Sequence, residues 1–200
     1  MRKTITLFEN LRAVPYTPFY FTIARGDWAR EGIDVRVETS PAMSQTAEAL
    51  LDGRADVSWG GPMRVMTYHD KDPECPLVCF GQGVARDPFI LVGREPNKHF
   101  RFQDLAGLKV AVAEEAPTPW LTFQDDLGRA GFPPDRLKRT PDQPMADNVA
   151  ALRAGELDVV QVFEPYAEQL VTEGAGHIWH RFAERGDIAY TSFYTTKAFA

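Results

Sequence analysis

Residues 49–57, Ala-Leu-Leu-Asp-Gly-Arg-Ala-Asp-Val, and residues 151–159, Ala-Leu-Arg-Ala-Gly-Glu-Leu-Asp-Val, share one pattern at an offset of 102 positions. In each copy an apolar pair ends an amphipathic stretch, a glycine follows where a helix stops, and Asp-Val opens an apolar run. The pattern predicts a helix that ends directly before a buried strand. Its recurrence indicates that the chain contains a duplication.

The elements predicted around the two copies agree with this interpretation, because both halves show the order β-α-β-α-β. Before the first copy we expect a strand at 3–8, a helix at 18–31 closed by Gly32 and a strand at 34–38; before the second, a strand at 109–113, a helix at 119–130 closed by Gly131 and a weaker extended piece at 136–140.

This alternation favours two α/β lobes, each with a mainly parallel sheet covered by helices. Ligands of open α/β sheets bind beyond the carboxyl ends of the strands, so two such sheets facing each other predict a ligand cleft. We place the first lobe at residues 1–92 and the second at 93–189, with residues 190–200 returning to the first lobe. Two strands that cross between the lobes predict a hinge.

Composition and charge exclude several classes of function. The 200 residues are 44% hydrophobic, which is enough for a real core, and carry a net charge of −6 without a basic patch, so nucleic acid is not expected as a partner. No run approaches the roughly 20 apolar residues of a membrane helix. The short apolar run after Met1-Arg2-Lys3 stops at Glu9, so we expect no export signal in this sequence.

Motifs for cofactors and metals are not evident. His177 and His180 fall on opposite faces of a predicted strand, and no phosphate loop, dinucleotide loop or serine elbow is present. Cys75 and Cys79 are expected to be two buried, reduced thiols. We therefore predict no cofactor, no metal and no enzymatic activity.

The sequence resembles one known family, the solute-binding proteins of ABC importers for sulfonates, taurine, nitrate and thiamine-pyrimidine precursors. The resemblance runs from about residue 3 to the end and rests on these segments: Pro18 to Phe21, Ala24 to Trp28, Glu31 to Val35, Leu51 to Val57, Asp104 to Ala111, Gly155 to Val159, and Glu164-Pro165-Tyr166.

The resemblance implies a two-lobed type II periplasmic-binding fold, a small-molecule ligand, a membrane permease as partner, an extracytoplasmic location and a monomer. Two features depart from the family: the export signal is missing, and members continue with further helices after the returning strand, so the sequence is expected to be a fragment. An enzymatic branch of the family makes a thiamine pyrimidine from its own histidine and a lysine-bound cofactor. The resemblance places that lysine and histidine just after the strand that corresponds to 56–59. Here residues 60–66 hold neither residue.

Candidate ligand-binding residues follow the strands of each lobe. In the first lobe they are Glu9, Asn10, Tyr16, Phe19, Gly60, Gly61, Pro62, Arg64 and, on the returning strand, Tyr194; in the second they are Glu115, Thr118, Trp120, Glu164 and Tyr166. The glycine turn suits close approach of a ligand, and Arg64 suits an anion. Thr118-Pro119 is predicted to cap a helix, and proline at 62 to start one.

Structural alternatives stay open for several of these residues. Gly60-Gly61 also suits a tight turn, Arg64 a solvated helix face, Trp120 a contact of its helix with the sheet, and Tyr194 packing at the hinge. The carboxylates and aromatic rings favour a flat heteroaromatic ligand such as a pyrimidine, whereas Arg64 and the glycine turn favour a small anion. A cytoplasmic enzyme of pyrimidine metabolism that uses Glu9, Glu115 and Glu164, and a ligand-sensing domain, are the alternative functions.

Overall fold

The computed structural model describes residues 3–42 and 45–200, so Met1 and Arg2 of the basic N-terminus lie outside it. The chain forms two compact units, Met1–Ala85 with Ile188–Ala200, and Arg86–Asp187. The chain passes from the first unit to the second between Ala85 and Arg86, before the strand at Ile90–Gly93, whereas we expected this boundary after residue 92. It returns to the first unit between Asp187 and Ile188. That strand therefore belongs to the sheet of the second unit.

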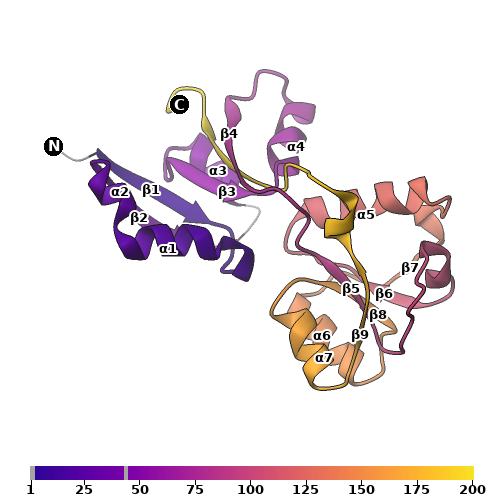
Figure 1. The fold of residues 1–200 in the computed structure, drawn as a ribbon. Coiled ribbons are helices and arrows are strands. Elements are labelled where there is room, and N and C mark those ends of the chain that lie inside the picture. Colours follow the sequence, from indigo (N-terminus) through magenta and orange to yellow (C-terminus); the bar gives the residue numbers. More distant parts are fainter. Residues whose placement is uncertain (1–2, 43–44) are drawn as a thin grey trace. The chain divides into compact units, whose positions relative to one another are not determined.

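The first unit is built on a five-stranded sheet of order β2-β1-β3-β10-β4. β1, β2 and β3 run parallel, and β10 is antiparallel to both of its neighbours, as the yellow strand in Figure 1 shows. Its elements are β1 (Lys3–Glu9), α1 (Thr17–Arg25), α2 (Asp27–Arg30), β2 (Ile33–Thr39), α3 (Gln45–Leu51), β3 (Val57–Gly60), α4 (Met63–Lys71), β4 (Leu77–Val84) and β10 (Thr191–Thr196).

The second unit repeats this topology in the order β7-β6-β8-β5-β9, where β5 takes the antiparallel position that β10 holds in the first unit. Its elements are β5 (Ile90–Gly93), β6 (Lys109–Ala111), α5 (Pro117–Arg129), β7 (Lys138–Arg139), α6 (Met145–Arg153), β8 (Val159–Val162), α7 (Tyr166–Thr172) and β9 (His177–Arg181). The predicted duplication is confirmed at the level of strand order.

The repeated Asp-Val pair has the same structural role in both units. Asp56 accepts a hydrogen bond from the Thr6 N–H through its carboxylate (2.7 Å) and donates its own N–H to the Thr6 carbonyl (2.9 Å). Asp158 forms the equivalent pair with Lys109, at 2.9 and 3.1 Å. The glycine of each copy has a φ of 78° or 76°, the left-handed conformation that ends the preceding helix.

Some predicted details were wrong. The helix expected at 18–31 is divided at Gly26, whose φ of 68° ends α1, and α2 follows as a separate short helix. α5 begins at Pro117, so Thr118 is its second residue and not its cap. Cys75 is buried as expected, but Cys79 is exposed on β4.

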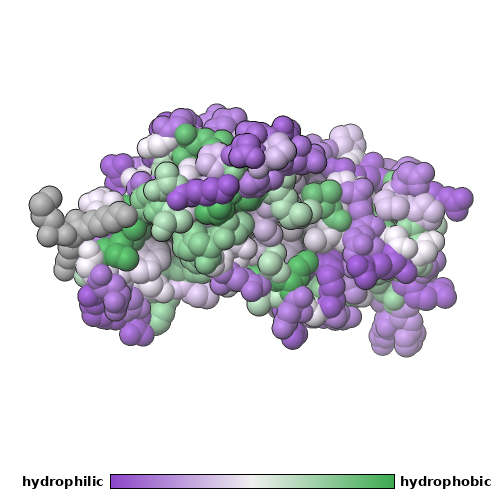
Figure 2. Space-filling view, turned by 90° about the horizontal axis from the view of Figure 1, so that it is seen from above, coloured by the Kyte–Doolittle hydropathy of each residue, from purple (hydrophilic) through white to green (hydrophobic). Residues whose placement is uncertain are grey.

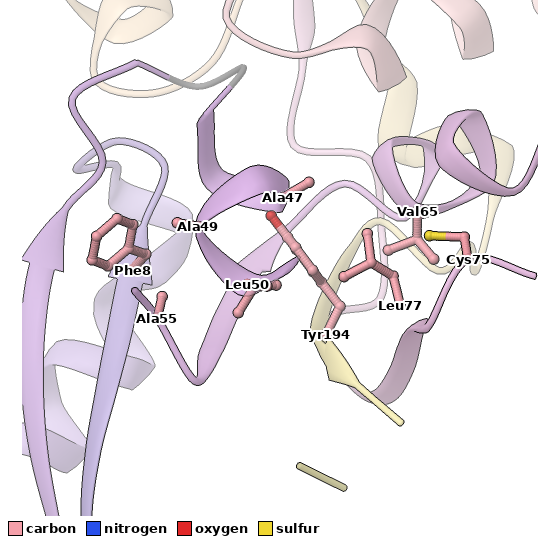
Figure 3. Packing of buried hydrophobic residues seen from close by; sticks show 9 residues of the cluster. All are labelled: Phe8, Ala47, Ala49, Leu50, Ala55, Val65, Cys75, Leu77 and Tyr194. Atoms are coloured by element: carbon pink, nitrogen blue, oxygen red, sulfur yellow. The ribbon is translucent and has the colours of Figure 1, made fainter. Parts of the chain in front are cut away.

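Two apolar clusters fill the first unit, one on each face of its sheet. Figure 3 shows the cluster that β1, β4 and β10 form with α3 and α4, in which the side chain of Tyr194 extends towards Ala47. The opposite cluster is aromatic: Tyr16, Phe19 and Trp59 are buried there, and Phe193 packs against them. The rings of Phe19 and Trp59 lie 4.7 Å apart, within the range of favourable aromatic pairs.

Apolar side chains also reach the surface of the first unit. Figure 2 shows hydrophobic areas between polar ones on this unit, and Phe21, Met66 and Phe80 are each more than half exposed. A groove of about 260 Å³ lies on the sheet and is lined only by apolar residues, namely Ile5, Leu7, Trp28, Ile33, Val35, Val57, Phe80 and Phe193. No helix in the described ranges is both long and apolar enough to cross a bilayer.

In the second unit a buried ion cluster joins α5 to the two segments at the unit's ends. Arg185 donates to Asp87 at 2.9 Å and to Asp126 of α5 at 3.0 Å, and the Asp87 side chain is completely buried. Burial raises the pKa of Asp87, while its hydrogen bonds to the Phe89 N–H and to Arg185 act in the opposite direction. A buried acid of this kind depends on its partner, because an unpaired buried charge is strongly destabilising.

We predict that Arg185→Met lowers the free energy of unfolding by about 3 kcal/mol at neutral pH, since Asp87 then loses its cation inside the protein. The variant should hold Asp87 protonated in the folded state, with a pKa above the unfolded value of about 4. A raised folded pKa gives stability that is lost as pH rises, so the penalty should shrink towards about pH 4. Denaturant unfolding at several pH values measures both effects.

Arg129→Met is the matched control, because Arg129 pairs with Asp125 on the same helix while its side chain is 78% exposed. Its cost should be about 0.5 kcal/mol or less. If both variants lost the same free energy of unfolding at every pH, the buried ion cluster would not contribute to stability as we predict.

Candidate functional site

The parallel strands of the first unit end at one edge of the sheet, and Glu9 closes β1 there. Its side chain is fully buried and accepts hydrogen bonds from Arg12 (3.0 Å), Tyr20 (3.0 Å) and Thr39 (2.9 Å). Burial, together with the hydrogen bond to Glu9, raises the pKa of Tyr20 to about 12. Glu9 therefore organises the strand ends of its own unit.

Asn10, Gly60 and Arg64 converge at the same edge. The Asn10 amide donates to the Trp59 carbonyl at 2.8 Å, and its oxygen accepts from Thr46 at 2.6 Å and from Arg64 at 2.8 Å. A Cβ at position 60 would lie 2.2 Å from the Asn10 amide nitrogen, so the glycine makes room for this side chain. Arg64 is buried on the first turn of α4. The alternative that it lies on a solvated helix face is therefore wrong.

Pro62 and Gly61 shape the start of α4. Pro62 was predicted to be the first residue of this helix. The helix instead begins at Met63, and Pro62 occupies the capping position directly before it. The Gly61 carbonyl accepts from the Arg64 N–H at 3.3 Å. This turn carries Arg64 to the edge where β3 ends.

The three aromatic candidates of the first unit lie in its core. Tyr16 stacks on Phe19, and both contact Trp59. Tyr194 is fully buried on β10, and its hydroxyl has no hydrogen-bond partner among the described residues. Burial also raises the pKa of Tyr16, so its phenol is neutral at physiological pH.

In the second unit Glu115 and Thr118 lie where β6 leads into α5. One carboxylate oxygen of Glu115 accepts from the N–H of Met145 at the start of α6 (2.7 Å), and the other is buried without a partner in the described part of the chain. Burial raises the pKa of Glu115, which favours the protonated form of that second oxygen.

The first turn of α5 offers hydrogen-bond donors. No side chain caps the helix at Ala116, and because Pro117 and Pro119 have no N–H, only Ala116 and Thr118 offer one among the first four positions. The Thr118 hydroxyl is buried and has no partner among the described residues. Unpaired N–H groups at a helix N-terminus attract anions.

The remaining candidates of the second unit make contacts within it. Trp120 has the Arg139 guanidinium 4.7 Å above its ring and meets the edge of Phe123. Glu164 accepts from the Glu168 N–H at 2.9 Å in the first turn of α7, and Tyr166 contacts the ring of Phe163. Trp120, Glu164 and Tyr166 are each partly exposed.

Two residues near these strand ends were not predicted. Trp59 is fully buried, and its indole N–H has no partner among the described residues. Gln161 is fully buried on β8 in an otherwise all-valine strand. A polar side chain in the middle of a buried parallel strand is the sequence signal that marks Gln161, because such a group must be hydrogen-bonded.

Within residues 3–42 and 45–200 no group of three or more histidine, cysteine, aspartate or glutamate side chains is arranged to hold a metal ion. His177 and His180 lie on β9, and burial lowers the pKa of His180. The polar atoms at the strand ends can instead donate hydrogen bonds to a small acceptor.

Comparison with known proteins gives matches over most of the chain. Residues 29–181 match the family described as ABC transporter, phosphonate, periplasmic substrate-binding protein. The protein YtlA of Bacillus subtilis (strain 168) is 25% identical over 197 residues, which is 98% of this chain and 59% of YtlA. The chain therefore spans about three fifths of the length of this relative.

Solved structures of the same architecture include the periplasmic aliphatic sulphonate binding protein SsuA from Escherichia coli, with 18% identity, a TM-score of 0.75 and coverage of 100% of this chain and 67% of that one. PhnD1 from Prochlorococcus marinus (MIT 9301), in complex with methylphosphonate, is 11% identical with a TM-score of 0.69, over 100% and 78% of the two chains. These likenesses show the type II periplasmic-binding fold.

The family match covers more than half of the sequence, and the topology of both units agrees with it. The chain belongs to the phosphonate periplasmic substrate-binding protein family of ABC transporters.

Proposed function

We propose that the chain is the ligand-capturing part of an ABC importer and that it binds a small sulfonate or phosphonate through hydrogen-bond donors at the strand ends. The observation that carries this proposal is the contrast between the acids and the donors at these positions. Glu9, Glu115 and Glu164 each accept hydrogen bonds inside their own unit, whereas several buried donors have no partner among the described residues.

The donors suit an anion. In the second unit the buried hydroxyl of Thr118 can donate. In the first unit the hydroxyl of Tyr194 can donate, and Arg64 adds a buried positive charge. A buried polar atom without a partner costs about 1–3 kcal/mol. An oxyanion that accepts from such a donor would recover part of this cost on binding.

The same contacts weaken the case for a flat heteroaromatic ligand. That hypothesis needs free aromatic faces and free carboxylates. Tyr16 and Phe19 stack on each other in the core, and Arg139 covers one face of Trp120. Both carboxylate oxygens of Glu9 already accept from protein donors, so Glu9 is not free to accept from ring amines.

The relatives support the same ligand class. An alkanesulfonate-binding protein SsuA from Xanthomonas axonopodis pv. citri, bound to MOPS, shares the fold with a TM-score of 0.74, and PhnD1 was solved with methylphosphonate. Binding without chemistry also agrees with the hydrogen bonds that engage Glu9, since an enzyme on this fold would need an acid and a base that are free to act. We infer a membrane permease as partner and an extracytoplasmic location from the family.

We predict that ethanesulfonate or methylphosphonate raises the melting temperature of the purified chain, since a ligand at 100 times its Kd adds about 2.7 kcal/mol of stability. A thermal-shift series against these anions, nitrate and aminopyrimidines measures this. Stabilisation by aminopyrimidines alone would contradict the oxyanion proposal.

We predict that Thr118→Val weakens oxyanion binding about tenfold, which corresponds to the loss of one hydrogen bond to a charged group. The variant should not lose stability, because the hydroxyl has no partner among the described residues. Calorimetric titration and thermal unfolding measure the two quantities separately.

Thr122→Val on the same helix is the matched control. The Thr122 hydroxyl lies 3.0 Å from the Thr118 carbonyl and 3.4 Å from Asp87, so its removal should lower stability and leave the affinity within about twofold. If Thr118→Val lost stability and kept its affinity, Thr118 would not be part of the ligand site.

A further inference from the structure

Gln161 stands at the centre of the second unit without any part in the contacts assigned so far to the ligand. It lies on β8 between Val160 and Val162, and its side chain is fully buried. Burial of an amide is costly unless both of its ends are hydrogen-bonded. The position therefore requires specific partners.

The amide of Gln161 spans the segment that leads from β6 into α5. Its oxygen accepts from the N–H of Ala113 at 3.3 Å, and its nitrogen donates to the carbonyl of Pro119 at 3.2 Å. Because an N–H can only donate and a carbonyl can only accept, these partners fix the orientation of the amide. One side chain thus holds both ends of residues 114–118.

Those residues include Thr118, one of the donors that the proposed function assigns to the ligand. Thr118 immediately precedes Pro119, and its hydroxyl has no protein partner in the described ranges that could fix it. Two other contacts hold this part of the chain at different points. Asn148 donates to the Val112 carbonyl at 3.4 Å before the segment, and Glu115 within it accepts from the Met145 N–H at 2.7 Å. Of these contacts only that of Gln161 reaches the first turn of α5.

We infer that Gln161 is a positioning residue for oxyanion binding, and that it acts by fixing the first turn of α5 so that the Thr118 N–H and hydroxyl point to one place. This inference rests on the proposed function for its ligand but on Gln161's own hydrogen bonds for its geometry. If Gln161 served only stability, its substitution would lower the melting temperature without a specific effect on residues 113–118.

The test compares Gln161→Met with Val159→Ala. Methionine keeps an unbranched side chain of similar length and removes both hydrogen bonds. Val159 is fully buried on the same strand but pairs with Val110, before the segment begins. Both variants should lower the melting temperature. Calorimetric titration with ethanesulfonate and with methylphosphonate, and hydrogen exchange of the amides in residues 113–118 other than Pro117, then separate positioning from stability.

Gln161→Met should bind the oxyanion at least tenfold more weakly than the wild type, and its 113–118 amides should exchange faster, whereas Val159→Ala should change affinity less than twofold and leave those amides protected. Equal affinities in the two variants would overturn the inference. If the wild type bound neither anion, the proposed function would fail for these ligands, and hydrogen exchange would decide alone: protection of 113–118 unchanged by Gln161→Met would overturn the positioning role.

Discussion

The carboxylates of Asp56 and Asp158 fix the pairing from which the rest of each unit follows. Each accepts from a backbone N–H of the neighbouring parallel strand, and the same residue's N–H returns a bond to that strand, so the register is set where β3 and β8 begin. In a parallel sheet the register at one end dictates which side chains meet at the other. Through these pairs β1 and β3 align with Glu9 opposite Trp59, and the loops that follow them meet at one edge.

The architecture could be predicted because it depends on a local sequence pattern that occurs twice. A glycine with positive φ, an Asp and a short apolar strand occur twice, and the strand orders of the two units match accordingly. The unit boundary was missed because β5 is an apolar strand in either assignment, and only its pairing with β8 and β9 assigns it to the second sheet. The division of the helix at Gly26 was missed because the apolar pattern continues through both pieces.

The candidate site was harder to predict because position along a strand does not reveal what a side chain contacts. Glu9 and Asn10 lie at the expected edge, but Arg12, Tyr20 and Thr46 meet them there from other elements. Gly60 is needed for the Asn10 side chain, which no local pattern indicates. Gln161 carried a visible signal, a polar residue inside a valine strand, yet its partners Ala113 and Pro119 became known only from the packing of β8 against the start of α5.

These contacts change the chemistry expected of the ligand. Glu9, which looked available from the sequence, is a structural acceptor. The buried side-chain atoms without a partner in the described part of the chain are mostly donors, apart from one oxygen of Glu115. Membership of a substrate-binding family and a buried Thr118 hydroxyl at a helix N-terminus, without a partner among the described residues, support the oxyanion that we propose as ligand.

The most direct test of the central claim is the amide NMR spectrum of the chain with and without saturating methylphosphonate or ethanesulfonate. The account predicts a downfield shift of the Thr118 amide on binding, while the indole N–H of Trp179, already bonded to the Glu95 carbonyl at 2.7 Å, stays in place. A saturated complex in which the Thr118 amide and its neighbours do not move would contradict oxyanion binding at the start of α5.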